Sequence, residues 1–166
     1  MSSCHLRLSG SLSRPYSVAV WADDAQPATI VALTAGSSNA GSETLADQSP
    51  AQLSCMSNGE LSHCIVVDQI GAHSSIGYLL RVRNGALALG PSVQAATPTM
   101  QAADLNQDGW IDIAGLQNDY TPNYAAGRVY WQTWVSDGTQ LRSTGCGALG
   151  HAASSPPTAP LTGKCP

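Results

Sequence analysis

The chain has 166 residues, a formal net charge of −4 and 11% charged residues, whereas an ordinary soluble domain has about 25%. This length fits a single domain with a sizeable core. The sequence has no basic stripe that would favour nucleic-acid binding, and it has no apolar run near the roughly 18 residues of a membrane span.

In chain order, the sequence predicts strands separated by turns and almost no helix. The expected strands are apolar or alternating runs at residues 18–21, 28–33, 64–70, 78–83, 86–89, 129–135 and 139–142. Two of the turns contain pairs typical of tight hairpins, Asn84-Gly85 and Asp137-Gly138. No stretch longer than about ten residues keeps a 3.6-residue period with helix caps. The fold class is therefore predicted to be all-β.

The strand expected at residues 129–135 carries bulky side chains on both faces. Alternation places Trp131 on one face and Tyr130 and Trp134 on the other. A strand with one face in solvent is polar on that face. The pattern therefore predicts a strand packed between neighbouring sheets.

A repeat underlies these strands. The order apolar strand, polar loop, strand, tight turn, strand and glycine occurs at residues 64–90 and 110–145, with a fainter copy at 19–33. We therefore expect about three blade-like antiparallel four-stranded units of roughly 45–50 residues. They are placed at residues 15–50, 51–98 and 99–149 of a single domain that spans 1–150.

Three units are fewer than the roughly four to eight blades of a closed β-propeller. The expected architecture is therefore partial or oligomer-completed and β-propeller-like, and open sheet edges favour a homo-oligomer or polymer. Residues 151–166 are expected to form an extended arm rich in Pro, Ser and Thr. This arm either frays or attaches through Cys165 to its own domain or to a neighbouring subunit.

The five cysteines indicate an oxidising, extracellular location. Cys55 and Cys64 flank Asn58-Gly59, a hairpin turn signal, and are predicted to form a disulfide. A zinc site is the alternative, but the CxxC spacing it needs is absent. One further disulfide is expected among the remaining cysteines, with the pairing left open. They are Cys4, Cys146 and Cys165.

Residues 104–112 place oxygen-bearing side chains at alternate positions, as a loop wrapped around Ca²⁺ requires. The predicted ligands are the side chains of Asp104, Asn106, Asp108 and Asp112 and the carbonyl of Trp110. Gly109 permits the left-handed turn that directs this carbonyl. An EF-hand would need a Glu at the twelfth position, which here is Gly115. The remaining alternative is a turn rich in Asp and Asn that binds no ion.

The loop reads DLNQDGWID and is followed by the apolar run at residues 111–116. This segment resembles the FG-GAP and VCBS repeats of integrin-α-type β-propellers, whose signature is DxDxDGxxD followed by a short apolar strand. Asn106 stands where that signature has its second Asp, which removes one charge and should weaken the site. The resemblance is specific over residues 103–145, weaker over 54–90 and only suggestive before that. It implies a calcium-binding module that serves in recognition and adhesion.

Alignment of the units leads to a further hypothesis. Cys55 and Cys64 fall, within about a residue, where Asp104 and Asp112 fall in the next unit. We therefore expect the same hairpin to be closed covalently in the second unit and by Ca²⁺ in the third.

The sequence carries no catalytic signature, and the chain is expected not to be an enzyme. Its four histidines include no HExxH motif, and residues 71–77 contain neighbouring His and Ser but no GxSxG. The expected function is that of a calcium-stabilised extracellular structural or adhesive module, which binds a protein partner or its own copies.

The alternative is a carbohydrate-binding, lectin-like module that uses surface Tyr and Trp. The candidate binding loop lies within residues 117–127, which are polar and contain two tyrosines. Its candidate residues are Asn118, Asp119, Tyr120, Asn123 and Tyr124. Core positions are the competing interpretation for Trp131 and Trp134.

Overall fold

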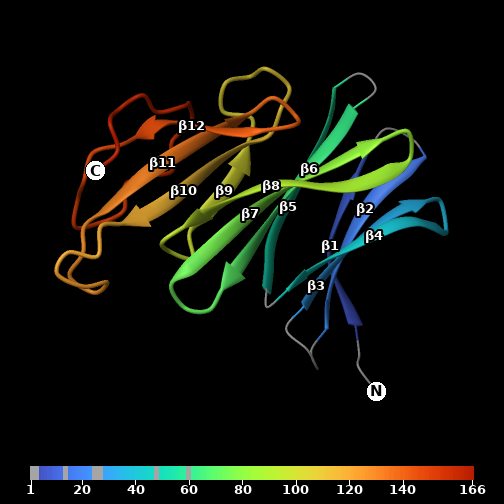
Figure 1. Ribbon diagram of the computed structural model, residues 1–166, viewed down its shortest axis with the longest axis horizontal. Helices are drawn as coiled ribbons and strands as arrows, with labels where there is room; N and C mark the ends of the chain where they lie inside the picture. The colour runs from blue at the N-terminus through green and yellow to red at the C-terminus, as the bar shows by residue number, and fades with distance from the viewer. Residues whose placement is uncertain (1–3, 13–14, 24–27, 47–48, 59–60) are drawn as a thin grey trace.

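The computed structural model describes the chain except residues 1–3, 13–14, 24–27, 47–48 and 59–60. Its described residues form three four-stranded antiparallel sheets, each built from consecutive strands (Figure 1). The all-β prediction and the three four-stranded units are confirmed. Within the described ranges, the sheets close into neither a barrel nor a propeller ring.

The strands of each sheet follow one another in the chain. The first sheet contains β1 (Cys4–Ser11), β2 (Tyr16–Asp23), β3 (Ala28–Ala35) and β4 (Ser38–Ala46). The second contains β5 (Ser49–Asn58), β6 (Leu61–Ile70), β7 (Ser74–Arg83) and β8 (Ala86–Ala95). The third contains β9 (Met100–Ala103), β10 (Asp112–Asn118), β11 (Val129–Ser136) and β12 (Leu141–Cys146).

Two strands of the first sheet were not predicted. β1 begins ahead of the expected first unit, and β4 has the sequence SNAGSETLA, which has no apolar alternation. Both pair with apolar neighbours along most of their length, β1 with β2 and β4 with β3. Their strand conformation is therefore set by tertiary pairing and not by their own residues.

The predicted hairpin turns are present where they fall on described residues. Asn84 and Gly85 join β7 to β8 with φ values of 51° and 73°, as a two-residue turn of the mirror-image type requires. Of the Asn58-Gly59 turn, Gly59 lies outside the described residues. The strands on either side of it, β5 and β6, nevertheless pair from Asn58↔Leu61 onwards.

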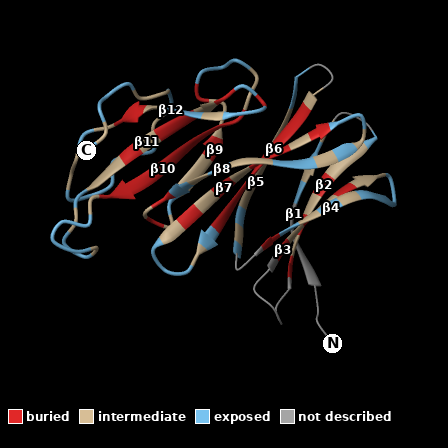
Figure 2. Cartoon of the chain, viewed as in Figure 1, coloured by how far each residue is buried: buried red, intermediate tan, exposed pale blue. Residues whose placement is uncertain are grey.

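The sheets pack face to face, and the cores lie between them (Figure 2). β6 is buried on both faces because alternate residues point to opposite neighbours. Toward the first sheet the core consists of Val18, Val20, Val31, Leu33, Leu45, Cys64, Val66, Leu80 and Val82. Toward the third sheet it consists of Ile65, Val67, Leu79, Ala102, Ile111, Ile113 and Trp134.

The outer face of the third sheet is covered by the C-terminal segment of the chain. Leu161 packs beside Trp131, and its N–H donates to Thr133 Oγ1 at 2.9 Å. The indole N–H of Trp131 donates to the Ser154 carbonyl at 3.1 Å. A disulfide joins Cys146 to Cys165. The segment at residues 151–166 thus lies against its own domain. β11 is packed on both faces, but the prediction of a neighbouring sheet is correct for one face only, because this segment covers the other.

Candidate functional site

The acidic loop (residues 104–112) connects β9 to β10. Its last residue, Asp112, pairs in the ladder with Ala103, the last residue of β9. Leu105 is buried and packs in the cluster around Trp131. The two ends of the loop are therefore held together by strand pairing, and one apolar side chain fixes its first turn to the core.

The polar side chains of this loop turn inward onto its own amides. The two oxygens of Asp104 accept the N–H groups of Asp108 and Gly109 at 3.2 and 3.0 Å. Asn106 Oδ1 accepts the same Asp108 N–H at 3.2 Å, and Asn106 Nδ2 donates to Asp108 Oδ2 at 2.7 Å. Asp108 Oδ1 accepts the Trp110 N–H at 2.9 Å. Three oxygen-bearing side chains thus converge on one turn.

The backbone reverses at two points within this turn. Gln107 and Gly109 have φ values of 62° and 88°. A positive φ is readily adopted by glycine and is uncommon for other residues. The prediction that Gly109 allows a left-handed turn is confirmed, and Gln107 adopts one as well.

Asp112 has a different environment from the other three side chains. It is fully buried, and its two oxygens accept the backbone N–H groups of Leu105 and Ser136 at 2.9 and 2.8 Å. Burial raises the pKa of Asp112, the two N–H bonds lower it, and the charges of Asp108 and Asp104 raise it further. Asp112 therefore joins the end of the acidic loop to its beginning at Leu105 and to the end of β11 at Ser136.

The chemistry of these donors fits a hard cation, because all are carboxylate or amide oxygens. Within the part of the chain that the structure describes, no three His, Cys, Asp or Glu side chains gather as a ready metal site. Asn106 and the Trp110 carbonyl supply the additional oxygens in the predicted set. A carboxylate has about four lone-pair sites, so the oxygens of Asp104 and Asp108 can accept these hydrogen bonds and still contact a cation.

His63 lies beneath the acidic loop and was not predicted from the sequence. Its Nε2 accepts the Ile111 N–H at 2.8 Å, and its ring centroid lies 4.8 Å from that of Trp110. Burial lowers the pKa of His63 to about 4, although Asp108 and Asp104 raise it. A neutral His63 therefore joins the second sheet to the loop. One sequence signal could have pointed to it. His63 comes immediately before Cys64, as Ile111 comes immediately before Asp112, so the two residues occupy equivalent positions in neighbouring units.

The predicted Cys55–Cys64 disulfide is confirmed, with Cα atoms 4.1 Å apart. The two cysteines are direct partners in the β5–β6 ladder, as Ala103 and Asp112 are in the β9–β10 ladder. The spacing along the chain is the same in both pairs. The expected correspondence between the units therefore holds for the strand register, with Ala103 as the direct partner of Asp112.

Three residues of the candidate binding loop shape the loop itself. Buried Asn118 accepts the Tyr120 N–H at 2.7 Å and donates to the Tyr124 carbonyl at 3.0 Å. Asp119 forms an ion pair with Arg128 at 3.0 Å. Asn123 Oδ1 accepts the Ala126 N–H at 3.1 Å. These side chains are therefore engaged within the loop.

The two tyrosines of this loop form a surface aromatic cluster with a residue of the second sheet. Tyr120 is 48% exposed. The Tyr124 ring centroid lies 5.6 Å from that of Tyr120 and 4.2 Å from that of His73, which lies in the β6–β7 turn. Trp131 and Trp134 are buried, in line with the core interpretation. Tyr120 and His73 are exposed and Tyr124 is half-buried, so the three rings form a partly exposed aromatic cluster.

Comparison of the chain with protein-family models, curated proteins and solved structures gives no match. Its function is therefore inferred from its own residues. The two disulfides indicate an oxidising environment. Among the described residues, no helix is long and apolar enough to cross a membrane.

Proposed function

We propose that this chain is a calcium-stabilised extracellular structural or adhesive module. Its acidic loop would bind Ca²⁺, and its sheets would present surfaces for a protein partner or for further copies of the chain. The observation that carries the proposal is the convergence of Asp104, Asn106 and Asp108 on one turn whose ends are held by strand pairing. The resemblance of this loop to FG-GAP repeats supports the same function.

The ligands would come from one continuous segment. The four side chains at positions 104, 106, 108 and 112 and the Trp110 carbonyl would hold the ion, which would supply positive charge among three aspartates. Without a cation, these carboxylates repel one another at the surface. The ion would therefore stabilise the β9–β10 connection and the contact of the loop with His63.

Self-association is supported by a difference between the two outer faces of the sheet stack. On the outer face of the first sheet, Trp21 lies opposite Ile30 across the β2–β3 ladder, and both are only half-buried. The corresponding face of the third sheet is covered by residues 151–166. An apolar sheet face of this kind is suited to packing against another sheet.

The test measures particle mass and melting temperature with calcium and with a chelator. Calcium should raise the melting temperature of the wild type, and Asp108→Ala should abolish this increase. At a free calcium concentration ten times Kd, the stabilisation is about 1.4 kcal/mol. Asp137→Ala, which removes an exposed carboxylate from the β11–β12 turn, is the matched control and should keep the response. A monomer whose melting temperature ignores calcium would contradict both the metal and the assembly proposals.

Carbohydrate binding is the second candidate, and the partly exposed cluster of Tyr120, Tyr124 and His73 favours it. Aromatic faces stack on the apolar faces of sugar rings. A glycan array with the wild type and Tyr120→Ala tests this function. Signals that Tyr120→Ala removes and that Leu89→Ala leaves intact would support it, since Leu89 is the other large exposed apolar side chain among the described residues.

A further inference from the structure

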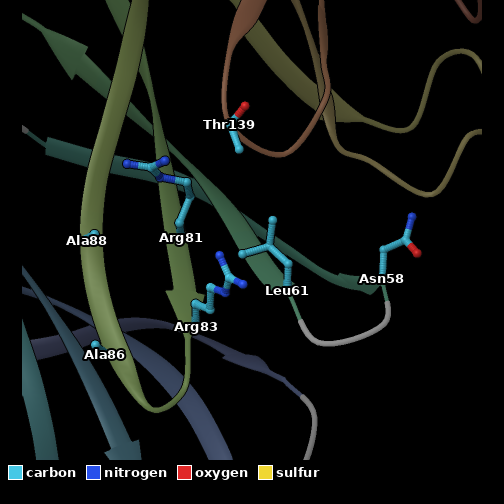
Figure 3. A pocket seen from close by; sticks show the side chains of 7 residues that line it. All are labelled: Asn58, Leu61, Arg81, Arg83, Ala86, Ala88 and Thr139. Atoms are coloured by element: carbon cyan, nitrogen blue, oxygen red, sulfur yellow. The ribbon is translucent and has the colours of Figure 1, made fainter.

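A pocket of about 420 Å³ lies between the second sheet and the β11–β12 turn. This volume falls within the range of about 300–1,000 Å³ found for ligand pockets. Figure 3 shows the two arginines projecting from β7, with Thr139 across from them on the neighbouring turn. The lining residues are Asn58, Leu61, Arg81, Arg83, Ala86, Ala88 and Thr139.

The floor of the pocket is a regular part of the second sheet. Arg83 lies opposite Leu61 of β6 and Ala86 of β8, and Arg81 lies opposite Ala88. Residues two apart on a strand share a face, so the guanidinium groups of Arg81 and Arg83 rise from the same side of β7. The small apolar neighbours leave the space above the floor open. Two fixed positive charges therefore border an apolar surface.

These two arginines differ from the others whose contacts are described. Arg128 and Arg142 have aspartate partners at 3.0 and 3.3 Å. Arg81 and Arg83 have no ion pair with a carboxylate of the described residues. In addition, Arg81 Nε is buried without a hydrogen-bond partner. A buried donor of this kind normally has a partner, and among the described residues none is present, so this atom is available to an acceptor in the pocket.

We propose that this pocket binds a carboxylate of an acidic peptide segment, such as a Glu side chain of a protein partner. The guanidinium fork matches a carboxylate in a two-bond arrangement. Leu61, Ala86 and Ala88 offer an apolar surface for the methylene groups of the side chain. The site deepens the proposed function by naming the chemistry of the partner. This inference rests on one part of the proposed function, namely that the module binds another protein chain.

The lining argues against two other anionic ligands. Phosphate sites are usually built from backbone N–H groups at helix N-termini or in nests, whereas this floor is a sheet whose N–H groups bond to neighbouring strands. Sugar sites use aromatic faces, and none of the lining residues that the structure describes is aromatic. A carboxylate on a peptide side chain fits both features.

The walls of the pocket touch the acidic loop. Asn58 faces Gly109, and the Trp110 ring lies against Gly138, the neighbour of Thr139. Because both walls contact this loop, calcium bound by the loop would also affect the shape of the pocket. Peptide binding is therefore measured both in calcium and in a chelator. The arginines belong to the second sheet, so the effect of substituting them on peptide affinity can be measured in either condition. Absence of calcium binding would overturn the calcium proposal alone and would leave the peptide result interpretable.

The experiment uses fluorescence anisotropy with two labelled peptides of equal length, hexaglutamate and hexaglutamine, on the full chain. Hexaglutamate should bind the wild type at least about tenfold more tightly, and Arg83→Gln should weaken its binding by about tenfold or more. Arg83→Lys should fall in between, because the charge remains and the fork is lost. Arg128→Gln removes the same charge at the far end of the third sheet and should keep wild-type affinity within about twofold.

Three results would overturn the proposal. Equal affinity for the two peptides would show that the pocket does not recognise a carboxylate. Equal losses of affinity in Arg83→Gln and Arg128→Gln would show that binding depends only on the net charge of the protein. Tighter binding of an oligouronate than of hexaglutamate would show that the ligand is an acidic sugar and not a peptide. Arg83 is exposed, so Arg83→Gln should fold, as circular dichroism and melting would verify. The Arg81→Gln, Arg83→Gln double variant should lose more affinity than the single one.

Discussion

The two faces of β6 show how one repeated unit is stabilised in two different ways. Toward the first sheet, the hairpin is closed by the Cys55–Cys64 disulfide, and the buried titratable residue is Asp68. Toward the third sheet, the matching hairpin is closed by the hydrogen bonds of Asp112, and the buried titratable residue that β6 contributes is His63. Both interfaces have apolar cores, so the difference lies in their polar groups.

Burial moves the pKa values of Asp68 and His63 in opposite directions. It raises the pKa of Asp68 to about 7, with a partly opposing hydrogen bond from Thr29, and it lowers the pKa of His63 to about 4. Burial therefore favours the neutral form of each side chain, because it disfavours the charged form of acid and base alike. One interface is thus weakened by rising pH and the other by falling pH.

The largest effect is expected at Asp68. Its folded pKa of about 7 lies above the ordinary value of 3.8, so the folded state binds more protons between these values. The stabilisation is complete below about pH 4 and is lost as pH rises to about 7. A tenfold change in proton affinity corresponds to about 1.4 kcal/mol, so Asp68→Asn should be more stable than the wild type at pH 8 by on the order of 4 kcal/mol.

Urea unfolding of both proteins from pH 4 to 8 measures this difference. The gap between the two curves should open as pH rises and stay constant above about pH 8. Asp137→Asn alters an exposed carboxylate and should leave the wild-type curve nearly unchanged over this range. Parallel curves for the wild type and Asp68→Asn would show that Asp68 has the same pKa in the folded and unfolded states and would contradict the prediction.

The second effect is expected at Asp112. Asp112→Ala should lower the free energy of unfolding by about 2–4 kcal/mol, because two buried N–H groups lose their acceptor. Asp108→Ala, measured in chelator, is the control and should cost about 1 kcal/mol or less, since its carboxylate is exposed. Equal losses in chelator would mean that Asp112 has no special role in closing the hairpin.

The disulfide of the second sheet should have a slightly smaller effect. The Cys55→Ala, Cys64→Ala double variant should lose about 2–3 kcal/mol in guanidinium unfolding, because the unfolded chain regains the freedom of a short loop. Mass spectrometry of non-reduced fragments provides the companion measurement. A fragment that links Cys55 to a cysteine other than Cys64 would contradict the claim that this disulfide closes the β5–β6 hairpin.

The smallest effect is expected from Asn106→Asp, which supplies the second aspartate of the FG-GAP signature. In chelator the new charge near Asp104 and Asp108 should cost about 0.5 kcal/mol. In calcium the same charge should increase calcium affinity, since ligand charge tunes such loops. Calorimetric titration and melting in the two conditions measure this change of sign. A loss of stability in both conditions would indicate a turn that binds no ion.

Much of the fold was predictable because its central strands carry their own signal. β2, β3, β6 and β7 are apolar runs bounded by turn residues. β1 and β4 were not predicted, since their small polar residues become strands only through pairing with β2 and β3. The Cys55–Cys64 pair followed from a local turn, whereas the Cys146–Cys165 pair depends on how the C-terminal segment folds back.

The candidate sites show the same limit. The acidic loop is continuous in sequence, so its candidate ligands could be named from the sequence alone. His63 was missed because its bond to Ile111 joins different sheets. Arg81 and Arg83 fall in the strand predicted at residues 78–83, and only the adjacent β11–β12 turn makes them part of a pocket. Contacts between sheets are therefore what the sequence could not supply.

The C-terminal segment bears on the proposed self-association. Residues 151–166 cover one end of the sheet stack and are tied there by the Cys146–Cys165 disulfide, so among the described sheets only the first offers an outer face that is not covered. If copies pair through this one face, they would form a two-fold dimer with no such face left for a third copy. Under this proposal, the segment would limit the addition of further layers.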